Sequence, residues 1–242
     1  MWWVPKRTRA YRRNKLKTEN INSRRAILWD LDGTIVNSEP FHRMAWREIF
    51  EQQNVQFNEE IFQFGFGRRN DEIIREFFGQ DLSQQEVNAI AAKKEETFRR
   101  FIGDDIKAFP CVVELIKSLT QAEFQIAIVS STPIENIRLI TETLEIKKYF
   151  KFFITGKDVT EGKPSPQGFL LAAQKLRLKP EECVVMEDAV AGVRAAKSAG
   201  MYCIAVTNTR PREDLAEADI VVNSLEKVNV KTIEQLFNRA QK

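Results

Sequence analysis

Cysteine and histidine are scarce in this sequence of 242 residues, which contains three cysteines and one histidine. Zinc sites are built largely from these residue types at short spacings, and the cysteines lack any C-x-x-C spacing, so the pattern argues against zinc. Cys183 and Cys203 fall in apolar runs typical of buried strands. We interpret them, together with Cys111, as small buried thiols in a reducing cytosol.

Long hydrophobic runs are also missing. No apolar run approaches the roughly 18 residues that a membrane span needs, and there is no signal-peptide pattern. The sequence therefore predicts no membrane span and a cytoplasmic location. With 43% apolar residues, the chain can bury one substantial core and a smaller second one. The sequence does not determine the oligomeric state, and a monomer is the simplest expectation.

The formal net charge of +3 hides an uneven distribution. Residues 1–25 hold nine lysines or arginines and a single glutamate, whereas the rest of the chain has 28 basic and 33 acidic side chains. Because residues 1–24 show no hydrophobic period, we expect a disordered basic leader. Two interpretations stay open: a solvated tail, or an arm for organellar targeting or for contact with nucleic acid or an anionic surface.

From residue 25 onward, short apolar runs alternate with amphipathic stretches. The runs are continuous and rich in β-branched residues, as in a parallel sheet that is covered on both faces. The predicted strands are 26–29, 125–129, 152–154, 183–186, 202–206 and 220–222. The predicted helices between them are 112–122, 135–144, 167–176 and 190–199. This alternation indicates an α/β fold with a doubly wound, Rossmann-like parallel sheet.

One long interval between the first and second predicted strands breaks this alternation. Its apolar pattern is helical, and a structureless loop of that length is implausible in a compact domain. The helical stretches are 41–53, 71–78 and 83–102. We therefore expect an α-helical cap domain at 38–105, inserted into an α/β catalytic core formed by 25–37 and 106–242.

Polar side chains follow the predicted strands where each strand ends. In an open parallel sheet, ligands bind beyond the carboxyl ends of the strands, so we expect these side chains to converge. Carboxylates, hydroxyls and a single lysine suit a divalent cation and a phosphoryl group, and oxygen ligands indicate Mg²⁺ rather than zinc. The residues are Asp30, Asp32, Ser130, Ser131, Thr132, Lys163, Glu187 and Asp188.

The order of these residues resembles the four motifs of the haloacid dehalogenase superfamily of phosphotransferases. DLDGT at 30–34 resembles the first motif, and Ser130, at the end of IAIVS, resembles the second. Lys163 in GKPSP resembles the third motif, and Glu187-Asp188 in VVMEDAVAG resembles the fourth. The similarity extends from residue 25 to about residue 228.

The resemblance implies a role for each aspartate of the first motif. Asp30 would be the nucleophile that forms an aspartyl-phosphate. Asp32 would protonate the leaving oxygen and later activate the acceptor, a role for which we expect its surroundings to raise its pKa. True dehalogenases of this superfamily lack the second aspartate, so the presence of Asp32 favours phosphoryl transfer.

The resemblance also implies the ligands of the metal and of the phosphoryl group. Mg²⁺ would be bound by the Asp30 carboxylate, the main-chain carbonyl of Asp32, and Asp188, with Glu187 assisting directly or through water. The transferring oxygens would be bound by Lys163 and Ser130. We assign Ser131 and Thr132 to substrate binding.

The helical insert resembles the cap of the phosphatase and β-phosphoglucomutase branch. His42, the one histidine, matches the mutase histidine that readies the acid–base aspartate. Arg68 matches the arginine that grips the distal phosphate, and Lys94 matches a cap lysine. For each of the three, an ordinary solvated side chain is the alternative. Asn37 stands where an aspartate is usual, which weakens a mutase-specific assignment.

Three functions are therefore compatible with the sequence. The first is a Mg²⁺-dependent phosphatase of a small phosphorylated metabolite such as a sugar phosphate. The second is a hexose-phosphate mutase of the β-phosphoglucomutase type, which differs in how long the closed cap excludes water. The third, from another class, is a catalytically idle binding protein that acts through its basic leader.

Overall fold

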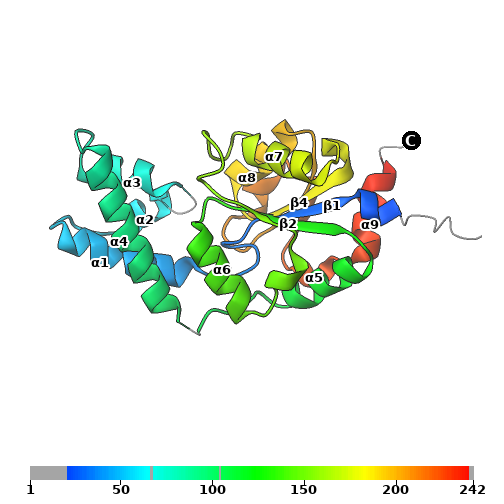
Figure 1. The fold of residues 1–242 in the computed structure, drawn as a ribbon, viewed down its shortest axis with the longest axis horizontal. Helices are drawn as coiled ribbons and strands as arrows, with labels where there is room; N and C mark the ends of the chain where they lie inside the picture. Colours follow the sequence, from blue (N-terminus) through cyan, green and yellow to red (C-terminus); the bar gives the residue numbers. More distant parts are fainter. Residues whose placement is uncertain (1–20, 66–67, 104, 240–242) are drawn as a thin grey trace, which may run out of the picture.

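The computed structural model describes residues 21–65, 68–103 and 105–239 (Figure 1). Residues 1–20 of the predicted leader lie outside the described residues. The last four residues of that segment, Ile21–Arg24, form a 3-10 helix, η2. Its Asn22 side chain donates a hydrogen bond to Glu234 at 3.0 Å. Within the described part of the chain, no helix combines the length and the apolar character that a membrane span requires.

A six-stranded parallel sheet forms the centre of the molecule, with strand order β3-β2-β1-β4-β5-β6. This topology confirms the predicted doubly wound sheet, and the strand bounds differ from the predicted ones by one residue at most. The strands are β1 (Ala26–Trp29), β2 (Gln125–Val129), β3 (Phe153–Ile154), β4 (Cys183–Glu187), β5 (Tyr202–Val206) and β6 (Ile220–Val222).

Helices cover both faces of the sheet (Figure 1). Ile27 and Trp29 of β1 point into one apolar cluster, and Ala26 and Leu28 point into the other, as the alternation of strand side chains requires. The first cluster includes residues of α5 (Val112–Gln121), α6 (Ile134–Thr143) and α9 (Val230–Arg239). The second includes residues of α7 (Gln167–Leu176) and α8 (Val190–Ser198). Short 3-10 helices join these elements: η3 (Lys147–Tyr149), η4 (Pro180–Glu182), η5 (Arg212–Leu215) and η6 (Leu225–Lys227).

The insert between β1 and β2 is helical and has its own apolar core. Trp46, Ile49, Phe50, Ile74 and Val87 are buried in it, and Figure 1 shows it beside the sheet. The capping box of Ser83 and Glu86 explains why the longest of its helices begins at residue 84. The helices are α1 (Glu39–Gln52), α2 (Glu59–Gly65), α3 (Asn70–Phe78) and α4 (Gln84–Ile102).

The structure differs from the sequence predictions at two helices and one cysteine. The short helix α2 and the C-terminal helix α9 have no counterpart among the predicted helices. Cys183 and Cys203 are buried as expected, but Cys111 is exposed because it precedes α5 at the protein surface.

Candidate active site

A cavity of about 750 Å³ lies between the carboxyl edge of the sheet and the helical insert. Every site residue that the sequence analysis proposed lines this cavity, in both the core and the insert. These residues are Asp30, Asp32, His42, Arg68, Lys94, Ser130, Ser131, Thr132, Lys163, Glu187 and Asp188. Sequence segments far apart in the chain therefore meet at one place.

Lys163 bridges two carboxylates: Asp30, which follows β1, and Glu187, the last residue of β4. Its ammonium donates to Asp30 Oδ1 at 2.6 Å and to Glu187 Oε1 at 2.5 Å. Burial alone would lower the pKa of Lys163, but the two carboxylates raise it above its ordinary value. The lysine therefore remains a cation beside Asp30, where it can attract a phosphoryl group.

Glu187 is fixed from both sides. While one carboxylate oxygen accepts from Lys163, the other accepts from the main-chain amides of Asp188 at 2.8 Å and Ala189 at 2.9 Å. Gly192 in α8 makes room for this carboxylate, since a Cβ atom there would lie 1.7 Å from Glu187 Oε1. Glu187 is therefore held rigidly, and it acts as an anchor that keeps Lys163 in position.

Three buried carboxylates form a cluster with the geometry of a cation site. Asp30, Glu187 and Asp188 each offer an oxygen, and these oxygens lie within 4.8 Å of one another. Burial and the neighbouring Glu187 raise the pKa of Asp188 to about 7. Burial also raises the pKa of Asp30 well above its ordinary value, against the opposing effect of Lys163. An all-oxygen donor set with excess negative charge fits a hard divalent cation such as Mg²⁺.

The loops around Asp188 fix its orientation. Thr34 Oγ1 donates to Asp188 Oδ1 at 2.9 Å, and the Thr209 hydroxyl donates to the other carboxylate oxygen. Gly33 adopts a φ of +87°, and a Cβ atom there would lie 2.2 Å from Asp188 Oδ2. Only glycine fits this turn, because the first motif and Asp188 are in direct contact.

Asp32 has a different set of partners from Asp30. Ser38 Oγ donates to Asp32 Oδ1 at 2.5 Å, His42 Nε2 lies 3.4 Å from the same oxygen, and Thr132 donates to Oδ2. Burial would raise the pKa of Asp32, but these partners lower it below its ordinary value. The expectation that the surroundings raise this pKa is therefore wrong, since three groups stabilise the ionised form.

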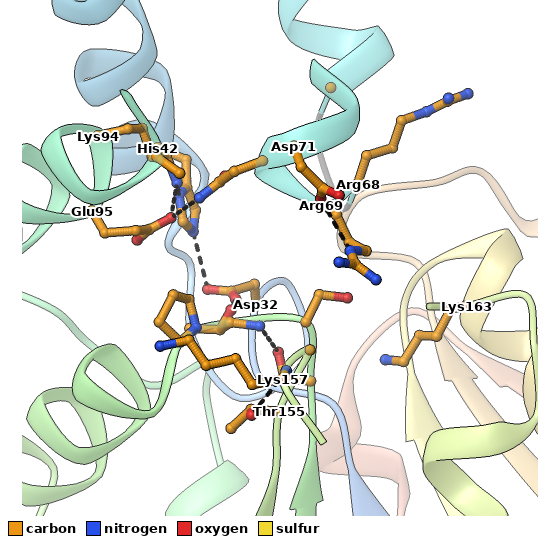
Figure 2. A pocket seen from close by; sticks show the side chains of 18 of the residues that line it. Asp32, His42, Arg68, Arg69, Asp71, Lys94, Glu95, Thr155, Lys157 and Lys163 are labelled. Atoms are coloured by element: carbon orange, nitrogen blue, oxygen red, sulfur yellow. Dashed lines mark hydrogen bonds and ion pairs between the residues drawn. The ribbon is translucent and has the colours of Figure 1, made fainter. Parts of the chain in front are cut away.

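The side chains of the insert separate into those near Asp32 and those near Lys163. The Lys94 ammonium lies 2.9 Å from His42 Nδ1, so both residues belong to the surroundings of Asp32. Figure 2 shows the Arg69 side chain directed toward the Lys163 side of the cavity, whereas the Arg68 side chain extends away from Lys163. The Arg68 guanidinium stacks over Phe64 at 4.0 Å, whereas Arg69 is paired with Asp71. Of the two arginines, Arg69 is the one oriented toward the proposed phosphoryl site.

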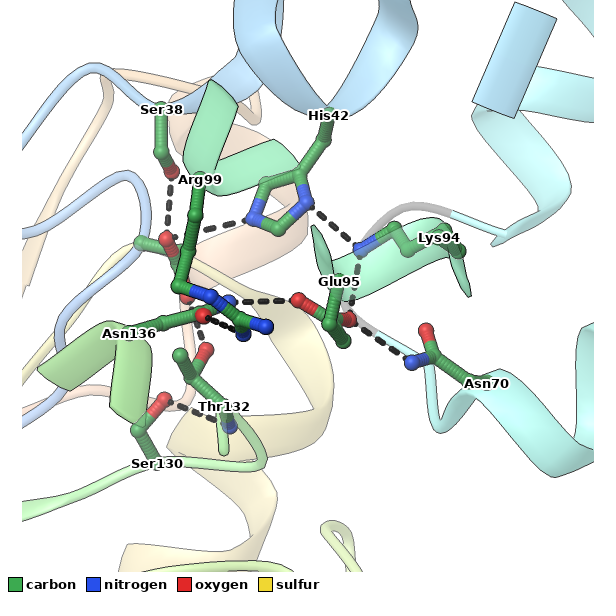
Figure 3. A network of polar contacts seen from close by, with 10 residues as sticks. Ser38, His42, Asn70, Lys94, Glu95, Arg99, Ser130, Thr132 and Asn136 are labelled. Carbon is green, nitrogen blue, oxygen red and sulfur yellow. Dashed lines mark hydrogen bonds and ion pairs between the residues drawn. The ribbon is translucent and has the colours of Figure 1, made fainter. Parts of the chain in front are cut away.

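Several residues of the site carry no motif that the sequence analysis could have used. Ser38 donates to Asp32 and Thr209 donates to Asp188, while Asn70, Glu95 and Asn136 form a network with Lys94 (Figure 3). Each is an ordinary polar residue in its segment. Only the packing of the insert on the core brings them together.

The chain matches the haloacid dehalogenase-like hydrolase family over residues 24–200. It is 33% identical over 213 residues to validoxylamine A 7'-phosphate phosphatase of Streptomyces hygroscopicus subsp. limoneus, covering 84% of this chain and 95% of that protein. It is 34% identical over 208 residues to hexitol phosphatase A of Escherichia coli, covering 85% and 94%. The crystal structure of β-phosphoglucomutase from Clostridium difficile superposes with a TM-score of 0.81 at 25% identity, covering 90% of this chain and 98% of that one. The chain therefore belongs to the haloacid dehalogenase-like hydrolases.

Proposed function

We propose that this protein is a Mg²⁺-dependent phosphatase of small phosphorylated metabolites, with sugar phosphates as the leading substrate class. One observation supports it above all: at one cavity, Asp30 contacts a lysine while Asp32 contacts a histidine and two hydroxyls. Two carboxylates with separate partners suit nucleophilic and acid–base roles. The two relatives named as phosphatases agree with this reaction type.

In the proposed mechanism, an Asp30 oxygen attacks phosphorus as the bond to the substrate oxygen breaks. Lys163 orients Asp30 and offsets the charge of the phosphoryl oxygens, and Ser130, which lines the same cavity, is placed to donate to them. A Mg²⁺ ion held by Asp30, Asp188 and the Asp32 carbonyl, with Glu187 nearby, would supply further charge neutralisation.

Proton transfer falls to Asp32 and its neighbours. The leaving oxygen needs a proton, yet Asp32 is ionised in the substrate-free protein. It must therefore take up a proton as substrate binds. His42 can relay one, because its Nε2 proton can pass to Asp32 while Lys94 delivers a proton to Nδ1, which leaves His42 neutral. Asp32 then accepts a proton from the attacking water, which releases phosphate from Asp30.

A hexose-phosphate mutase is the second candidate. The likeness to β-phosphoglucomutase and the contact of His42 with Lys94 favour it. The chemistry at Asp30 would be the same, with a sugar hydroxyl in place of water as the acceptor. The difference lies in how well the insert keeps water out.

A panel of phosphorylated sugars and Mg²⁺ tests the proposal. Free phosphate and isomerised sugar are measured in the same reactions, with and without a bisphosphate primer. Release of phosphate without isomer is the expected result. Isomer formation that depends on the primer would establish the mutase, and no reaction with any phosphate ester would leave only a binding role.

A further inference from the structure

Glu95 is a buried carboxylate whose partners come from three helices. Only 6% of this α4 residue is exposed. Its Oε1 accepts from Asn70 of α3 at 2.7 Å and from Lys94 at 2.8 Å, while Oε2 accepts from Asn136 of α6 at 2.5 Å. Burial would raise the pKa of Glu95, but Lys94 and the other partners lower it to about 2. Glu95 is therefore an anion inside the protein, and such a group needs a full set of donors.

The contact between Glu95 and Asn136 crosses from the insert to the core. Asn136 belongs to the core helix α6 and is fully buried. Besides donating to Glu95, it accepts from Arg99 of α4 at 2.8 Å. Figure 3 shows these side chains meeting between the two parts of the molecule. Glu95 has its full set of partners only when the insert lies against the core.

From Glu95, a chain of contacts leads to Asp32. Lys94 donates to Glu95 and also lies against Nδ1 of His42, whose Nε2 faces Asp32. Since a lysine ammonium only donates, Nδ1 must be the acceptor, and the ring proton sits on Nε2, toward Asp32. His42 is also stacked on Phe98 with ring centroids 4.0 Å apart. The position of Lys94 thus decides which ring nitrogen offers its proton to the catalytic carboxylate.

We propose that Glu95 is a positioning residue that couples the docking of the insert on the core to the alignment of Lys94, His42 and Asp32. When Asn136 meets Glu95, the carboxylate holds Lys94 on His42, and the acid–base pair is complete. When the two parts separate, Glu95 loses this donor and the alignment weakens. This inference rests on the proposed phosphatase function, since it concerns the protonation of the leaving oxygen.

The test compares two substrates in the presence of Mg²⁺. A sugar phosphate has a poor leaving group that needs a proton, whereas p-nitrophenyl phosphate releases a phenolate that needs little help. We expect Glu95→Gln to lower kcat/KM for the sugar phosphate by about tenfold to a hundredfold, the scale of a misplaced catalytic group. For p-nitrophenyl phosphate we expect a loss below about threefold. A merely structural role would lower both values together.

Three further variants complete the experiment. Glu96→Gln is the matched control, because Glu96 is the next residue, is exposed and pairs only with Lys93 among the described residues. Asn136→Ala removes the donor from the core side and should reproduce the selective loss, even if Glu95→Gln fails to fold. In a His42→Gln background, Glu95→Gln should add less than about threefold, because both act through the same proton.

The outcomes separate the two proposals. Selective loss in Glu95→Gln and Asn136→Ala, absent in Glu96→Gln, supports the inference. Equal losses on both substrates, or no loss, overturn it while the phosphatase function stands. If the wild-type protein hydrolyses neither ester with Mg²⁺, the proposed function fails, and this inference fails with it.

Discussion

Asp30 and Asp32 lie two positions apart and have opposite electrostatic surroundings. Burial raises the pKa of Asp30, with further contributions from Glu187 and Asp188, whereas the hydrogen bonds to Asp32 lower its pKa. For the proposed roles, Asp30 must be ionised and Asp32 must gain a proton. A cation bound among the carboxylates would favour ionised Asp30, so the nucleophile depends on the metal as well as on Lys163.

Replacement of Asp32 tests the acid–base assignment. Asp32→Asn keeps the size of the side chain but cannot exchange a proton, so we expect kcat on a sugar phosphate to fall by roughly 10²- to 10⁴-fold. Circular dichroism checks that the fold is retained. Asp105→Asn, at an exposed aspartate, is the control and should leave kcat unchanged. A loss smaller than about threefold in Asp32→Asn would show that another residue is the acid–base group.

At the scale of elements, the strands could be predicted almost to the residue. Their apolar runs are continuous because both faces of the sheet are covered, and polar motif residues mark where β1, β2 and β4 end. Helix α2 is short and aromatic, with no clear period. Helix α9, by contrast, has an amphipathic pattern, with Ile233, Leu236 and Phe237 buried on one face, so its sequence does contain a helical signal.

The cavity could be predicted only in part. The four motifs meet because the strands that carry them are parallel neighbours, which is a local consequence of the fold. The contact of Glu95 with Asn136 joins residues 41 positions apart and depends on how the insert docks. The orientations of Arg68 and Arg69 likewise depend on packing, because either arginine fits the same sequence pattern.

Helix α8 offers a test of the Glu187 anchor. Glycine to alanine in a helix is normally stabilising by up to about 1 kcal/mol. At Gly192, however, the new Cβ would overlap the Glu187 carboxylate, so we expect Gly192→Ala to destabilise the protein by roughly 1–3 kcal/mol and to lower turnover. Gly168→Ala in α7 is the comparison. Its new Cβ would lie 3.1 Å from a Val129 methyl group, so we expect a smaller loss of stability than for Gly192→Ala. Urea unfolding measures the free energy of unfolding of the two variants. Equal values for Gly192→Ala and Gly168→Ala would contradict the role of Glu187 as an anchor.

At the scale of the whole molecule, the carboxylate cluster links stability to pH. The raised pKa of Asp188, about 7, means that the metal-free folded state binds a proton that the unfolded chain releases near its ordinary pKa. Its contribution to the free energy of unfolding therefore falls as pH rises through this window. The lowered pKa of Glu95 acts oppositely, but that stabilisation is already complete above the unfolded pKa.

Magnesium should therefore stabilise the protein more at higher pH. At about pH 7.5 the cation relieves repulsion among ionised carboxylates, whereas at about pH 5.5 it must displace protons. We expect the rise in Tm caused by Mg²⁺ to be larger at the higher pH, measured by thermal unfolding against a chelator control. The same rise at both values, or none, would contradict a cation site at Asp30, Glu187 and Asp188.

The central claim is that Asp30 carries the phosphoryl group during turnover. The most direct measurement is a rapid acid quench of the protein with a ³²P-labelled sugar phosphate and Mg²⁺, followed by peptide mapping. We predict label on the peptide that contains Asp30 in the wild-type protein, and neither label nor turnover in a folded Asp30→Asn variant. Label on another residue, or sustained phosphate release by Asp30→Asn, would contradict the account.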